Sequence, residues 1–152
     1  MKLLKKITII LLMAFVGIQF IPTIRNQSVL ILQTDFNNTF EVPNNIQRIL
    51  KISCYDCHSN NTNYPWYNKI QPASWLLEKH IKEGKKELNF SEFGTYSKRR
   101  QKSKLKAVIN QIRDDEMPLY SYALIHGETI LSERNKKYLI DWLSKQKDGI
   151  QK

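Results

Sequence analysis

The side chains best suited to chemistry lie in one short stretch of the sequence, Cys54-Tyr55-Asp56-Cys57-His58. Its two cysteines are the only ones in the chain, and the histidine follows the second one directly. Thiols and imidazole bind metals, and a pair of thiols can instead form a disulfide or react covalently with another molecule. The spacing C-x-x-C-H therefore leaves four kinds of site to compare.

Three of the four have little support in the sequence. A disulfide across two intervening residues closes a tiny loop and stabilises little. A thioredoxin-like redox pair needs a βαβ setting, and no such pattern is present. A zinc site needs four ligands, and the remaining histidines, His80 and His126, form no second compact pair. The disulfide, the redox pair and the zinc module stay open as alternatives.

The fourth kind of site is a covalently attached c-type haem, for which C-x-x-C-H is the attachment motif. Cys54 and Cys57 each add to one vinyl group of the haem, and His58 is then held beneath the iron as its proximal ligand. The sequence therefore favours one haem c per chain, bound through these three residues.

The sixth coordination position of the iron needs a separate ligand, and Met117 is the favoured one. Of the three methionines, Met117 alone lies outside the N-terminal apolar segment. Pro118 breaks the preceding helix, so the thioether side chain is free to turn inward. His80 and His126 are the rival ligands, and either would give a haem of lower potential than methionine does.

The N-terminal segment predicts export. Three lysines precede an uncharged, mostly apolar run from Ile7 to Ile21, which is the pattern of a secretory signal. No small-residue cleavage site follows, and extension to Ile24 brings the run to the length that crosses a bilayer. We therefore expect residues 1–25 to be an uncleaved signal-anchor, a transmembrane helix in the bacterial inner membrane, with the rest of the chain in the periplasm. A cleaved signal and a soluble periplasmic protein are the alternative.

The remaining sequence predicts an all-α fold. Helical spacing of apolar residues predicts helices over about 44–54, from Pro72 to about Gly84, from Ser97 to about 113, and from Ser132 onward. Residues 89–96 are predicted to form a loop, and Ala123–Leu131 is the one segment that favours a small hairpin. The expected parts are a signal-anchor at 1–25, a linker at 26–43, a haem-binding domain at 44–147 and a C-terminal tail at 148–152.

Longer stretches of the chain resemble the bacterial single-haem "haem-binding domain" family of the cytochrome c superfamily. The resemblance covers about residues 45–145 and lies in the runs Cys54–Asn60, Tyr64–Tyr67, Ile70–Pro72, Leu88–Ser91 and Glu116–Leu119. It implies a helical domain wrapped around a covalently attached haem, and export. It also implies thioether bonds at Cys54 and Cys57, with His58 as the proximal ligand and Met117 as the distal one.

Aromatic side chains are expected to wall the haem pocket. The candidates are Tyr64, Trp66, Tyr67 and Trp75. Trp75 fits the role of a general core aromatic equally well.

The charge of the chain indicates a class of partner. The formal net charge is +10, and residues 79–106 hold ten Lys or Arg against three Glu. This segment is either a solvated helix face or a docking surface for an acidic redox partner protein or anionic lipid. Nucleic acid is not expected as a partner of an exported domain.

The function expected from these features is one-electron transfer by a membrane-anchored monohaem c-type cytochrome. The sequence contains no catalytic triad, no paired acid and base carboxylates in a motif, and no phosphate-binding loop, so an electron carrier without substrate bond chemistry is favoured over an enzyme. The alternative is a haem-based sensor or peroxidase-like enzyme whose sixth ligand is labile.

Overall fold

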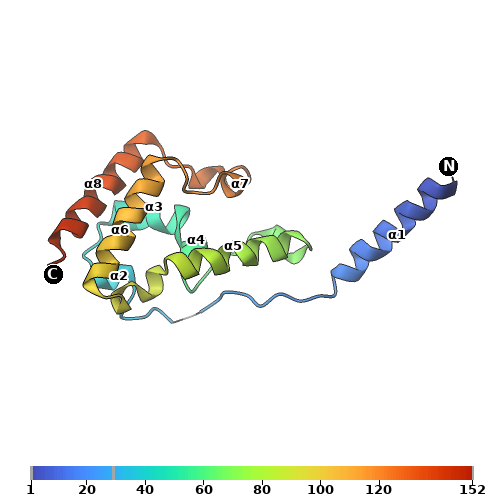
Figure 1. Cartoon of the computed structure of the whole chain (residues 1–152), viewed down its shortest axis with the longest axis horizontal. Helices are drawn as coiled ribbons and strands as arrows, with labels where there is room; N and C mark the ends of the chain where they lie inside the picture. Colours follow the sequence, from blue (N-terminus) through green and yellow to red (C-terminus); the bar gives the residue numbers. More distant parts are fainter. Residues whose placement is uncertain (1, 29, 152) are drawn as a thin grey trace.

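Helices make up all the regular secondary structure of the residues that the computed structural model describes, 2–28 and 30–151 (Figure 1). The predicted all-α class is therefore confirmed. The helices, with short 3-10 helices written η, are α1 (Lys2–Ile18), α2 (Phe36–Thr39), α3 (Asn44–Ser53), α4 (Tyr55–His58), η1 (Trp66–Lys69), α5 (Ala73–Glu87), η2 (Phe90–Thr95), α6 (Lys98–Arg113), α7 (Tyr120–Ala123), η3 (Gly127–Thr129) and α8 (Glu133–Gly149).

The two long helices α6 and α8 pack side by side, and α3 lies against α8 (Figure 1). Each long helix begins at a serine, Ser97 or Ser132, whose side chain accepts a hydrogen bond from the backbone of the first turn. The apolar residues of both helices recur at helical spacing and are buried in one core, which explains the confirmed predictions for these helices. Their buried members are Leu105, Ile109, Ile112, Leu139 and Leu143.

The expected linker, residues 26–43, is fastened to the domain instead of crossing open solvent. Asn26 binds the 59–62 loop through its side chain, and Thr34 accepts a backbone hydrogen bond from Gly94. Phe36 is fully buried, and its ring meets four other aromatic rings at centroid distances of 4.9 to 5.9 Å. These rings belong to Phe40, Phe90, Phe93 and Trp142. The packed domain therefore begins before residue 44, because aromatic burial of this kind stabilises it strongly.

Two further segments differ from the sequence-based expectation. Residues 89–96 contain the 3-10 helix η2, with Phe90 and Phe93 buried in the core. The segment Ala123–Leu131 contains the last residue of α7 and the whole of η3 but no strand, because its hydrogen bonds are local turns such as Thr129 N–H to His126 O at 2.9 Å. Short segments of this kind carry no period from which their structure could be read.

Both ends of the predicted haem-binding domain also differ in detail. Helix α8 continues to Gly149, and Ile150 is buried in the core, so the expected tail at 148–152 is partly structural. At the other end, helix α1 stands apart from the domain (Figure 1), and none of its side chains is buried. It ends at Ile18, earlier than the apolar run suggested. Within the described residues, no helix combines the length and apolarity needed to cross a membrane.

Candidate functional site

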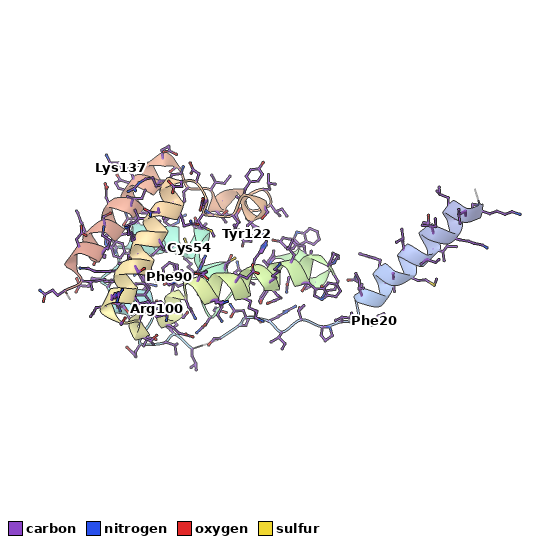
Figure 2. The ribbon with its side chains drawn as sticks, viewed as in Figure 1. Phe20, Cys54, Phe90, Arg100, Tyr122 and Lys137 are labelled. Carbon is purple, nitrogen blue, oxygen red and sulfur yellow. The ribbon has the colours of Figure 1, made fainter. Side chains whose placement is uncertain are left out.

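The C-x-x-C-H stretch forms a tight turn between α3 and α4. Cys54 ends α3 and begins α4, and its carbonyl oxygen accepts hydrogen bonds from the backbone N–H groups of Cys57, at 3.3 Å, and His58, at 3.0 Å. The stretch lies in the middle of the packed domain, where Figure 2 labels Cys54. The five residues of the motif therefore occupy one fixed turn.

The His58 ring is held in one orientation by the C-terminal end of α5. Its Nδ1 atom lies 2.9 Å from the carbonyl oxygen of Gly84 and 3.1 Å from that of Leu88. Since carbonyl oxygens only accept hydrogen bonds, Nδ1 carries the proton, and the lone pair of Nε2 is available to a metal. Burial lowers the pKa of His58, and the two hydrogen bonds oppose this shift. The imidazole is therefore neutral at pH 7, which is the ligating form.

Gly84 lets α5 approach α4 closely enough for this contact. A Cβ atom at this position would lie 2.8 Å from the carbonyl oxygen of Cys57, which is shorter than real Cβ contacts. The sequence indicated that Gly84 weakens or ends its helix. Instead, the helix continues to Glu87, and the glycine serves a close approach of two backbones.

Met117 is delivered to the site by the turn that ends α6. Asp115 adopts a left-handed conformation, φ 57°, and the N–H groups of Asp115 and Glu116 bond back to the carbonyls of Ile112 and Gln111. This is the hydrogen-bond pattern of a Schellman motif, with Asp in the position that glycine usually occupies. Lys136 of α8 forms an ion pair with Asp115 and so ties the turn to the neighbouring helix.

Two adjacent cavities meet at the predicted ligands. The larger has a volume of 320 Å³, inside the range of about 300–1,000 Å³ for small-molecule and cofactor sites, and the smaller adds 230 Å³. Both are lined by Cys54, His58 and Met117, and Cys57 lines the smaller one. The walls of the larger cavity are mainly apolar: Leu88, Phe90, Ala107, Val108, Ile112, Pro118 and Leu131. The two thiols, the imidazole and the thioether therefore converge on one cleft.

The cysteines are free thiols. Burial, and secondly the neighbouring thiol of Cys57, raises the pKa of Cys54 to about 12. Burial, and secondly Asp56, raises the pKa of Cys57 to about 11. Both thiols are thus protonated at neutral pH. In the described part of the chain, no group of three or more His, Cys, Asp or Glu side chains could hold a metal ion, so a zinc module gains no support.

The aromatic residues predicted to wall the haem pocket lie beside the cavities and not in their lining, and burial, followed by the charges of Cys57 and Asp56, raises the pKa of Tyr67. Tyr64, Trp66, Tyr67 and Trp75 are absent from the lining of both cavities. The loop that carries the first three folds toward the N-terminal segment and α7, where the Tyr64 hydroxyl accepts a hydrogen bond from the N–H of Asn26 at 2.6 Å. Trp66 is 73% exposed.

The two rival histidines are placed differently from each other. His126 lines neither cavity, and its Nε2 atom is hydrogen-bonded to the Tyr67 hydroxyl at 2.8 Å. His80 lines the smaller cavity. Met117 lines both cavities together with His58, His80 shares the smaller one with them, and His126 shares neither.

Sequence reasoning missed several residues of the site. Phe90 lines the larger cavity and meets the His58 ring edge-on at 6.4 Å. Tyr122, labelled in Figure 2, lines the smaller cavity. Its hydroxyl donates a hydrogen bond to Asp56 at 2.8 Å, and burial, followed by the contact with Asp56, raises the pKa of this tyrosine. Neither lies in a periodic segment. Among the walls of the larger cavity, only the face of α6 could be recognised in the sequence, because its apolar residues recur at helical spacing.

An apolar cleft flanked by two thiols, an imidazole and a thioether has the donor set of a haem protein. The match to known families agrees with this class. The family described as haem-binding domain matches residues 13–145, so the chain belongs to the haem-binding domain family. Comparisons with curated proteins and with solved structures gave no match.

The donor set of the chain fits the group that the family binds. His58 presents an unprotonated nitrogen, both thiols are unpaired, and the neighbouring walls are apolar, as an extended aromatic macrocycle requires. Both the family match and the residues that line the cleft therefore support haem binding by this chain.

Gly84→Ala tests the close contact between α4 and α5. The added methyl must move either α5 or the turn that carries Cys57 and His58, and overpacking of this kind costs about 1–3 kcal/mol. We expect a lower midpoint of thermal unfolding, followed by circular dichroism. Gly149→Ala is the matched control, because nothing lies within 4 Å of its Cβ position. Equal stability of both variants would show that α5 does not constrain the site.

Proposed function

We propose that this protein is a single-haem c-type cytochrome that carries one electron on the periplasmic side of a bacterial inner membrane. The observation that supports the proposal most is the convergence of Cys54, Cys57, His58 and Met117 on one apolar cleft. The bound haem would supply the one-electron chemistry of its iron. The proposal includes no substrate bond chemistry.

Each residue of the cleft has a part in this function. Cys54 and Cys57 bind the haem covalently, and His58 offers Nε2 to the iron while Gly84 and Leu88 fix its ring. Met117 offers the opposite ligand. Because methionine ligation raises the potential of a haem, this pair of ligands suits an electron acceptor better than two histidines would. The apolar walls exclude water.

Covalent attachment is tested first. Buried, protonated thiols are poor nucleophiles, so attachment depends on a c-type maturation system acting on the chain. Expressed with such a system, the wild-type chain should keep its haem stain on a denaturing gel, and a Cys54→Ala/Cys57→Ala double variant should lose it. A folded wild-type protein that carries zinc and no haem would refute the proposal.

Met117→Leu tests the distal ligand. Leucine keeps most of the volume at a cost below about 1.5 kcal/mol, but it offers no sulfur to the iron. The variant should lose the low-spin absorption spectrum and have a lower reduction potential than wild type. Met13→Leu, in the exposed helix α1, is the matched control. An unchanged spectrum would show that Met117 only packs in the cleft and does not bind the iron, and His80→Ala would then be the next variant. A high-spin spectrum in the wild type would instead favour the sensor or peroxidase-like alternative.

The N-terminal segment is proposed to export the domain and to hold it at the membrane. None of the apolar side chains of α1 is buried, and Leu3 and Leu4 are more than 70% exposed. Three lysines precede the apolar run, as in an anchor whose N-terminus stays in the cytoplasm. The mass of the native protein measures the outcome. A full-length N-terminus agrees with an anchor, whereas a mature N-terminus between residues 21 and 27 means cleavage and a free periplasmic protein.

The start of α6 is proposed to dock an acidic redox partner. Lys98, Arg99 and Arg100 are exposed there, and Arg100 stacks on the Tyr96 ring at 4.3 Å. Changing all three to Gln should slow electron exchange with an acidic partner at low salt and much less at high salt, because salt screens surface charges. Arg134, Lys137 and Lys145 on α8, changed to Gln, form the control. Equal effects of both triple variants would mean a general charge effect and no docking surface.

A further inference from the structure

The larger cavity contains a cationic side chain that the function described above does not use. Helix α6 lines this cavity with Lys104, Ala107, Val108, Gln111 and Ile112, which lie on one helical face. The rise of an α-helix separates Lys104 from Gln111 by about 10 Å. Met117 comes in the turn after the C-terminal end of α6, which is the end that carries Gln111. Lys104 therefore stands at the end of the cavity that is distant from the proposed distal ligand.

The two cavities differ in charge. Asp56, Glu83 and Glu87 line the smaller cavity, and its described lining contains no Lys or Arg. In the lining of the larger cavity, the described residues include one such cation, Lys104, beside Glu87. An anionic group entering the cleft is therefore repelled from the smaller cavity and attracted to the far end of the larger one.

Lys104 is held weakly in its present contact. Its Nζ atom lies 3.7 Å from the Oε2 atom of Glu87, which is too long for a hydrogen bond. The Lys104 side chain is 22% exposed, whereas that of Glu87 is 76% exposed. The Glu87 carboxylate can thus turn into water at little cost, because exposed ion pairs contribute little stability. Lys104 is then free to pair with another carboxylate inside the cavity.

We propose that Lys104 binds a propionate carboxylate of the haem. This inference rests on the proposed haem attachment. A haem carries its two propionates on the half opposite its two vinyl groups. Cys54 lines both cavities and Cys57 lines the smaller one alone, so the edge that both thioethers must reach is on the side of the smaller cavity. The thioether half therefore lies toward the smaller cavity, and the carboxylate half toward Lys104. A buried carboxylate needs a paired charge or hydrogen bonds, and Lys104 supplies the cation.

The reduction potential of the haem-loaded protein tests this assignment. In Lys104→Gln, the propionate loses its cation, and the added negative charge near the iron favours the oxidised state. The potential should fall at low salt, and the shift should persist at about 1 M salt, because buried pairs are screened much less than exposed ones. Lys104→Arg keeps the charge and should stay near wild type. Lys106→Gln removes the same charge from an exposed position on the same helix. Its shift should appear at low salt only.

Each outcome decides the point. If the Lys104→Gln shift disappears at high salt together with that of Lys106→Gln, or is absent at low salt, Lys104 is an ordinary surface cation and the assignment is overturned. Should Lys104→Gln fail to fold, Lys104→Met, which keeps the aliphatic stem, takes its place. Haem content is measured by absorbance on every variant. A wild-type protein without haem contradicts the proposed function itself, and this result is known before any variant is compared.

Discussion

The site depends on the contact between the turn at α4 and the end of α5. The last carbonyl groups of a helix have no partner within the helix, and the partial negative charge there favours a donor. His58 supplies this donor, because its Nδ1–H points at Gly84 and Leu88. This interaction gives the carbonyl of Leu88 a donor and adds a second donor to that of Gly84, which already accepts a hydrogen bond from the Leu88 N–H. It also fixes the imidazole tautomer and leaves Nε2 free. It requires the two backbones to approach so closely that only glycine is accommodated at position 84.

The opposite side of the cleft is held by a different pair of helices. The turn after α6 brings Met117 to the cleft, and Lys136 on α8 binds this turn through Asp115. The aromatic cluster around Phe36 joins both halves, since Phe90 follows α5 and Trp142 belongs to α8. The elements on both sides of the cleft therefore belong to one hydrophobic core. A group bound covalently on one side and ligated on the other would bind only the folded state and so stabilise that state.

Sequence reasoning reached the long helices and the chemistry-bearing residues more easily than the walls of the cleft. Helices α3, α5, α6 and α8 each carry an apolar face at helical spacing, which is a local signal. Phe36 and η2 carry no such signal, because their burial results from contacts with distant segments. Gly84 was read as a helix end, since a local rule cannot detect the neighbouring Cys57 carbonyl. The aromatic residues at 64–67 are predicted to wall the haem pocket, but none of them lines the two cavities, because Tyr64 and Tyr67 make their hydrogen bonds with Asn26 and His126.

The groups around the cleft would act in opposite directions on the iron of the proposed haem. Apolar walls would disfavour the more positive oxidised state, because burial in a poorly polarisable medium penalises added charge. Asp56 and Glu83, which line the smaller cavity, would favour that state. The Asp56 carboxylate has hydrogen-bond donors of its own. It accepts hydrogen bonds from the Tyr122 hydroxyl at 2.8 Å and from the Asn63 N–H at 3.0 Å. These donors spread its charge away from the cleft. Burial, and secondly the charge of Asp56, raises the pKa of Tyr122, so its hydroxyl remains a donor to Asp56 at neutral pH.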